Sequence, residues 1–182
     1  MFTKILLLCI FLVHSVYAYI YNDLLVKTQA TIFPKIILLD QNLSHKLQDG
    51  TIVFAIVYEK DDLYMAQSIK KMMEKSYDHL LDGYPFQIEL LEASQIGEIT
   101  KKVTAFYVLH LCEQAIVEVS KVASSKHIIT FSYDLDNLRK GLLFSVAMEQ
   151  SPTFYINKKN LYAENVNFVP PLLQMVTFID RN

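Results

Sequence analysis

Three short and almost uninterrupted apolar runs constrain the fold of this chain more than any other feature of its sequence. They span residues 51–58, 104–110 and 128–132 and are rich in β-branched and aromatic side chains. Runs of this length and composition are typical of strands that are buried on both faces. Such strands occur in parallel sheets that are covered by helices, so the three runs favour an α/β fold.

Amphipathic patterns between the runs predict the covering helices. A helix is expected over residues 22–40, with a kink or restart at Pro34. A second follows Asp61 or Asp62, either of which can cap it, and is stopped by Gly83 and Pro85. Its inward positions are Ala66, Ile69, Met73, Tyr77 and Leu80. A third helix is expected over residues 113–125, with Ile116, Val119, Val122 and Ala123 inward.

The remaining segments complete one domain. Residues 86–90 alternate as a strand, and residues 141–149 and 153–156 predict an antiparallel pair. The tail over residues 168–179 is expected to be a helix that begins at Pro170-Pro171. The sequence has no linker and no repeat. We therefore predict a single three-layer α/β domain, with a mostly parallel sheet, an antiparallel C-terminal strand pair and helices on both faces.

The N-terminus has the layout of an export signal. Lys4 gives a positive start, residues 5–13 are apolar, and Ala18 ends a segment suited to cleavage. We predict a signal peptide over residues 1–18, a mature domain over residues 19–182 and a periplasmic location. A retained N-terminal anchor is the alternative. Cleavage would leave 164 of the 182 residues and change the formal net charge from −2 to −3, with scattered basic residues. Nucleic acid is therefore not an expected partner.

Motifs for catalysis, metal binding or cofactor binding are missing from the sequence. The four glycines are far apart, which argues against a phosphate-binding loop. The histidines have no spacing typical of zinc sites, and no serine lies in a G-x-S-x-G motif. After cleavage Cys112 is the one remaining cysteine, and we expect it to be buried rather than poised for an external partner. His110 and Cys112 could share a strand face, but two ligands do not make a metal site. We expect no cofactor and no metal.

The carboxyl ends of the parallel strands are the best place to look for a binding site. In open parallel sheets, ligands bind outside these ends, where the loops diverge. Three loops should meet there, and their polar side chains suit a small polar ligand or a protein partner; ordinary solvated loops are the alternative. The candidate binding residues are Glu59, Lys60, Asp61, His110, Cys112, Ser132, Tyr133 and Asp134.

The C-terminal part of the chain combines the run from Phe154 through Ile156 and Asn157, a turn at Asn165, and an apolar segment with paired leucines at 172–173. These features resemble the C-terminal signature of the YfiR-like family of periplasmic proteins, and the likeness runs over most of the mature chain. Residues 128–132 and 143–146, with Gly141 between them, resemble the two preceding strands. These motif residues are interpreted as structural: Asn157 can cap the helix that follows it, and Asn165 tolerates a left-handed turn where the family has Gly.

The resemblance implies a regulatory function. YfiR-like proteins are exported and lack catalytic residues, and some hold a membrane-bound diguanylate cyclase inactive through its periplasmic part. Others are found with sensor kinases. This chain departs from the family in having no Trp and no pair of mature cysteines, so redox-controlled release is not expected.

Three hypotheses remain open on the sequence alone. The first is a non-catalytic regulator that binds the periplasmic domain of a membrane signalling protein, a diguanylate cyclase or a sensor kinase, which would place it in cyclic di-GMP signalling. The second is a soluble small-ligand receptor that feeds a membrane sensor or transporter. The third, an enzyme using His110 and Cys112, has the least support. The sequence is compatible with a homodimer but has no feature that requires one.

Overall fold

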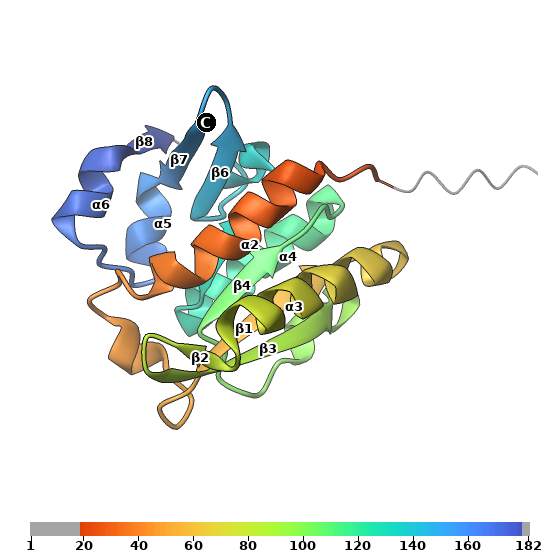
Figure 1. Ribbon diagram of the computed structural model, residues 1–182, viewed down its shortest axis with the longest axis horizontal. Helices are drawn as coiled ribbons and strands as arrows, with labels where there is room; N and C mark the ends of the chain where they lie inside the picture. Colours follow the sequence, from red (N-terminus) through yellow and green to blue (C-terminus); the bar gives the residue numbers. More distant parts are fainter. Residues whose placement is uncertain (1–18, 180–182) are drawn as a thin grey trace, which may run out of the picture.

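The computed structural model describes residues 19–179, so the predicted signal peptide over residues 1–18 lies outside the described residues. The helices and strands follow one another as strand–helix–strand units (Figure 1). In chain order they are α2 (Asp23–Ile37), η1 (Leu43–Lys46), β1 (Ile52–Tyr58), η2 (Lys60–Asp62), α3 (Leu63–Tyr77), β2 (Leu80–Leu81), β3 (Tyr84–Glu92), η3 (Ala93–Glu98), β4 (Ala105–Val108), α4 (Glu113–Lys126), β5 (Ile129–Ser132), η4 (Leu135–Leu138), β6 (Phe144–Met148), β7 (Pro152–Asn157), α5 (Lys158–Ala163), α6 (Pro170–Met175) and β8 (Val176–Ile179).

The strands form one eight-stranded sheet within residues 19–179, in the order β2-β3-β1-β4-β5-β6-β7-β8. β3, β1, β4, β5 and β6 are parallel to their neighbours in this series. β6 and β7 are antiparallel, as predicted for the C-terminal pair. The three apolar runs become β1, β4 and β5, which lie side by side in the middle of the sheet and are almost wholly buried. The predicted α/β class is therefore confirmed.

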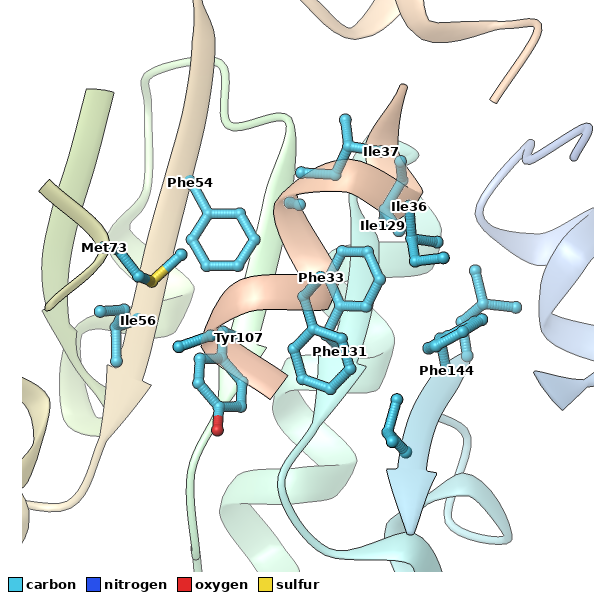
Figure 2. Packing of buried hydrophobic residues seen from close by; sticks show 14 of the residues in the cluster. Phe33, Ile36, Ile37, Phe54, Ile56, Met73, Tyr107, Ile129, Phe131 and Phe144 are labelled. Atoms are coloured by element: carbon cyan, nitrogen blue, oxygen red, sulfur yellow. The ribbon is translucent and has the colours of Figure 1, made fainter. Parts of the chain in front are cut away.

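Helices cover both faces of the sheet and create two hydrophobic clusters. α2 and α3 pack against each other and against one face, and α4 packs against the other (Figure 1). Phe33 of α2 is fully buried at the centre of the larger cluster. Its ring stacks on Phe131 at a centroid distance of 4.7 Å and meets Tyr107 edge-on at 5.1 Å (Figure 2). Pro34 lies inside α2, which continues to Ile37 without a restart.

Three predictions about element ends were wrong. The tail is helical only to Met175, and residues 176–179 form β8, which adds to the sheet parallel to β7. α3 ends at Tyr77 because Asp78 takes a left-handed conformation, so Leu80 lies in β2 and not on the helix. Asp62 is the N-cap residue of α3 but its side chain makes no capping bond; its carboxylate accepts a hydrogen bond from Tyr21.

The two asparagines of the C-terminal motif behave as predicted. The side chain of Asn157 accepts a hydrogen bond from the Lys159 amide at 3.0 Å and caps α5. Its amide group also donates to the Leu138 carbonyl at 2.6 Å, so one buried side chain joins β7 to η4. Asn165 has a φ of 50°, in the left-handed region. β7 contributes the buried Ile156 and the partly buried Phe154 to the larger cluster.

Gly141 and Glu164 fasten α5 to the sheet. Gly141 has a φ of 104°, which favours glycine, and its carbonyl accepts hydrogen bonds from Ser120 and Asn160. Glu164 is fully buried and accepts hydrogen bonds from the Thr130 amide at 2.8 Å and the Thr130 hydroxyl at 2.6 Å. Burial raises the pKa of Glu164 to about 8, although the bonds from Thr130 and the charge of Lys46 lower it. These contacts hold α5 against β5 and against the turn at Gly141.

Candidate ligand-binding edge of the sheet

The carboxyl ends of β1, β4 and β5 form one continuous edge, because these strands are parallel neighbours. We call the loops that leave them the carboxyl edge: residues 59–62, 109–113 and 133–137. Two direct contacts join the loops. The Nδ1 atom of His110 lies 2.8 Å from Asp134 Oδ2, and the Cys112 amide donates to Glu59 Oε1 at 3.3 Å. The predicted meeting of the three loops therefore exists in the structure.

His110 and Asp134 are the predicted candidates that the structure brings together most directly. Their side chains are 46% and 24% exposed, so the pair is reachable from solvent. It borders a hollow of about 380 Å³ that also carries the basic side chain of Lys140. The lining residues are His110, Leu111, Asp134, Leu135, Asp136, Asn137 and Lys140. Donors and acceptors thus face the same space.

Two other candidates, the last residue of β5 and the first residue of the loop that follows it, support the edge from the core side. Ser132 is fully buried, and its hydroxyl donates to the Asp134 carbonyl at 2.8 Å. Tyr133 is 5% exposed, and its hydroxyl accepts a hydrogen bond from the Asn22 amide at 2.8 Å. Burial raises the pKa of Tyr133, so its hydroxyl keeps its proton. Both side chains therefore shape the loop without facing the hollow.

Cys112 is exposed, so the prediction that it is buried was wrong. It directly precedes α4, where the chain has left the sheet, and it lines a separate hollow of about 210 Å³ with Glu59 and Ser94. The proposed pairing of Cys112 with His110 is not seen, because the two side chains line different hollows. Lys60 and Asp61 lie exposed on η2 and line neither of these two hollows.

The carboxyl edge is covered by residues 19–22, which no sequence pattern singled out. The Tyr21 hydroxyl donates to Asp62 Oδ2 at 2.5 Å and accepts from the His110 amide at 3.1 Å. The Tyr19 ring stacks on His110 with a centroid distance of 3.9 Å, and its hydroxyl donates to Asp134 Oδ1 at 3.0 Å. Burial, followed by the neighbouring carboxylates, raises the pKa of Tyr19. Two tyrosines in a terminal segment carry no pattern that points to such contacts.

Gln29 links the edge to the core. Its amide nitrogen donates to the carbonyls of Tyr133 and Val146, and its amide oxygen accepts from Tyr107 at 2.8 Å. All the polar atoms of this fully buried side chain are thus used within the protein. Because a buried polar group that is hydrogen-bonded in this way is held in one place, the loop after β5 has a rigid base.

Other hollows of the surface lie away from the carboxyl edge. A groove of about 490 Å³ follows α4 past Val117 and Lys121. A hollow of about 260 Å³ lies at the amino ends of β4 and β5, beside Val103 and Ile128. Within residues 19–179 no group of three or more His, Cys, Asp or Glu side chains is placed to hold a metal ion. No helix in the same residues has the length and apolar character needed to cross a membrane.

Comparison with known proteins identifies the fold. No family model matches the chain, and no curated protein matches its sequence. A conserved domain protein from Vibrio cholerae O1 biovar El Tor str. N16961 superposes with a TM-score of 0.61 at 11% identity, covering 86% of this chain and 60% of that one.

Two further solved structures are similar. The ABC domain in complex with L-Trp from Streptococcus pneumonia has a TM-score of 0.54 at 15% identity, covering 79% of this chain and 60% of that one. A substrate-binding protein with adhesive properties from Clostridium difficile, in its ligand-free, open structure, has a TM-score of 0.56 at 11% identity and covers 78% and 58%. This chain therefore spans about three fifths of the structures it resembles, and it shares their α/β fold.

Proposed function

We propose that this chain is a non-catalytic binding protein that takes a small ligand at the carboxyl edge of its sheet. The observation that carries the proposal is the His110–Asp134 pair, which opens onto a hollow shared with Lys140. Ligands of open parallel sheets bind outside the carboxyl ends of the strands. The hollow supplies both charges and both hydrogen-bonding roles, so a small polar ligand suits it.

The similar solved structures support this proposal. One is described in complex with L-Trp and another as a substrate-binding protein. Their fold is shared with this chain, and their ligand binding is what we extend to it.

The geometry of the edge favours binding over catalysis. A histidine held by an aspartate is also two thirds of a hydrolase triad, which needs a nucleophile within hydrogen-bond reach of the ring. Here Tyr19 covers one face of the His110 ring, and Cys112 lines a different hollow. A ligand at this edge would be held by the pair without being attacked.

A thermal-shift screen tests the proposal. The full-length chain is heated with a panel of amino acids, organic acids and nucleosides, because a ligand of the folded state raises the melting temperature. We expect one class of compound to stabilise the wild type and Lys121→Ala, and to stabilise Lys140→Ala less. Lys121 is the matched control, since it lines the groove along α4. Equal responses of the two variants, or no response to any compound, would contradict binding at the edge.

A second function, control of a membrane signalling protein, is favoured by exposed apolar side chains beside the same edge. Ile20 and Tyr64 are 91% and 83% exposed, and Leu24 is 60% exposed. They lie before α2 and on the first turns of α2 and α3, which pack side by side. Large exposed apolar side chains near one another mark protein-binding surfaces.

Under this second proposal, the exported chain resembles the YfiR-like inhibitors and holds the periplasmic domain of a diguanylate cyclase or sensor kinase, so that cyclic di-GMP signalling depends on it. Crosslinking in living cells, followed by mass spectrometry of the captured proteins, tests this. We expect the wild type and the control Val117→Ser to capture one membrane protein with a cytoplasmic signalling domain. Leu24→Ser should lose it. Equal capture by the wild type and both variants would contradict a partner surface at this edge.

A further inference from the structure

The Tyr19 ring is held as a bound ligand would be. Its face stacks on His110 with an interplanar angle of 9°, and its edges meet the rings of Tyr21 at 4.9 Å and Tyr133 at 5.9 Å. Its hydroxyl donates to Asp134 at 3.0 Å. One phenol ring is thus contacted by three aromatic rings and one carboxylate, which are the groups that recognise aromatic ligands. We call this space the Tyr19 slot.

The slot does not depend on Tyr19 for its shape. Tyr21 is fixed by its hydrogen bonds to Asp62 and to the His110 amide. Tyr133 is buried and bonded to the Asn22 amide, and the Asp134 carbonyl accepts the hydroxyl of Ser132. The walls are therefore held by contacts that Tyr19 does not make. A ring of the same shape would meet the same groups if the Tyr19 side chain moved away.

Tyr19 itself is weakly attached compared with the residues that follow it. Neither Tyr19 nor Ile20 makes a backbone hydrogen bond to any residue in 19–179, whereas the Asn22 side chain caps α2. Ile20 is almost fully exposed between the two tyrosines. A rotation at residue 20 would move Tyr19 out of the slot and would keep the Tyr21 and Asn22 contacts. The slot and the tethered ring then form a two-state element.

We propose that the Tyr19 slot is a binding site for the phenolic ring of a small molecule, and that Tyr19 is its built-in occupant, displaced when that ligand binds. The inference goes beyond the proposed function: the slot shares His110 and Asp134 with the hollow beside Lys140, and it takes a planar ring with a hydrogen-bond donor directed at Asp134. A tethered ring competes with a free one, so the apparent affinity of the wild type is the intrinsic affinity of the slot multiplied by the fraction of molecules in which the slot is open.

Removal of the Tyr19 side chain tests the inference. The probe is p-cresol, which is the tyrosine side chain as a free molecule, titrated into the full-length chain and followed by amide NMR. The variant Tyr19→Ala should bind p-cresol at least about tenfold more tightly than the wild type, because the competing ring is gone. Tyr19→Phe keeps the ring but loses the hydroxyl that donates to Asp134, so its affinity for p-cresol should lie between those of the wild type and Tyr19→Ala. Intact-mass measurement first establishes that all variants begin at the same residue.

Two further variants make the test specific. Tyr84 is 38% exposed, as Tyr19 is 37% exposed, and it lies on β3 at the other end of the sheet. Tyr84→Ala should therefore gain no p-cresol binding. The double variant Tyr19→Ala with Asp134→Ala should lose most of the gain, since the acceptor for the phenol is removed. Equal binding by the wild type, Tyr19→Ala and Tyr84→Ala would overturn the inference.

The outcomes separate this inference from the proposed function. Stabilisation of the wild type by a metabolite through Lys140, with no gain of p-cresol binding in Tyr19→Ala, rejects the built-in occupant and leaves the edge as a binding site. A gain of p-cresol binding in Tyr19→Ala supports the slot, whether or not a metabolite of the panel stabilises the wild type. The absence of any stabilising metabolite counts against the proposed function alone.

Discussion

Replacing Tyr21 by Phe tests the central contact of the carboxyl edge. The change removes one hydroxyl and keeps a ring that is 8% exposed and packs edge-on against Tyr19 and Tyr133. The lost hydroxyl donates to Asp62 at 2.5 Å and accepts from the His110 amide at 3.1 Å. The packing of the edge is thus unchanged, and the effect reports the two hydrogen bonds.

The magnitude follows from the charge of the acceptor. A hydrogen bond to a charged group contributes about 1.5–3 kcal/mol, and the partly buried amide that loses its acceptor adds to the cost. We expect Tyr21→Phe to lower the free energy of unfolding by about 2–3 kcal/mol. Tyr77→Phe is the matched control, because the Tyr77 hydroxyl donates to the neutral Thr31 carbonyl at 2.6 Å. Its loss should cost about 0.5–1.5 kcal/mol.

Urea unfolding followed by far-ultraviolet circular dichroism measures both variants. With a typical dependence on urea for a small domain, the expected loss in Tyr21→Phe moves the midpoint by about 1 M or more. A loss no larger than that of Tyr77→Phe would refute the reasoning. It would mean that the hydrogen bonds of Tyr21 with Asp62 and with the His110 amide do not hold residues 19–22 on the carboxyl edge.

Three further predictions concern the core and the C-terminal motif. Phe33→Ala should lower the free energy of unfolding by about 3–5 kcal/mol in urea, because a fully buried ring leaves a cavity; a loss below that of Tyr77→Phe would contradict the packing. Asn157→Ala should cost about 1–3 kcal/mol, since it removes a cap and one of the two hydrogen bonds that the Leu138 carbonyl accepts, whereas the surface cap variant Asn22→Ala should cost about 1 kcal/mol. Glu164 keeps its proton in the folded state up to about pH 8 and loses it near its usual pKa when unfolded, so its contribution to stability should fall as the pH rises through this range. Glu164→Gln should flatten that part of a series of urea midpoints against pH, and an unchanged slope would contradict the raised pKa.

The sheet was predictable because its central strands are apolar on both faces. β1, β4 and β5 can each be recognised as strands from their own residues. The helices between them then indicate the α/β class. The tail was not predictable in the same way. Pro170-Pro171 does start a helix, but residues 176–179 pair with the free edge of β7 as strand β8. This tertiary contact outweighs the local preference for helix.

The candidate site was predictable in position but not in composition. The rule for parallel sheets places the loops after β1, β4 and β5 at one edge, and His110 and Asp134 meet there as expected. The contacts of Tyr19 could not be predicted, because Tyr19 lies 115 residues from Asp134 and no local pattern links the two. Cys112 was misplaced because the general tendency of cysteine to be buried does not hold for a residue that follows the end of a strand.

Amide NMR mapping of a panel of small aromatic and polar fragments tests most directly whether the carboxyl edge is the binding surface of this protein. The account predicts that the largest and saturable shifts cluster in residues 59–62, 109–113 and 133–137, together with Tyr19 and Tyr21. Shifts that instead follow the groove along α4, at Val117 and Lys121, or the hollow beside Val103 and Ile128, would contradict it.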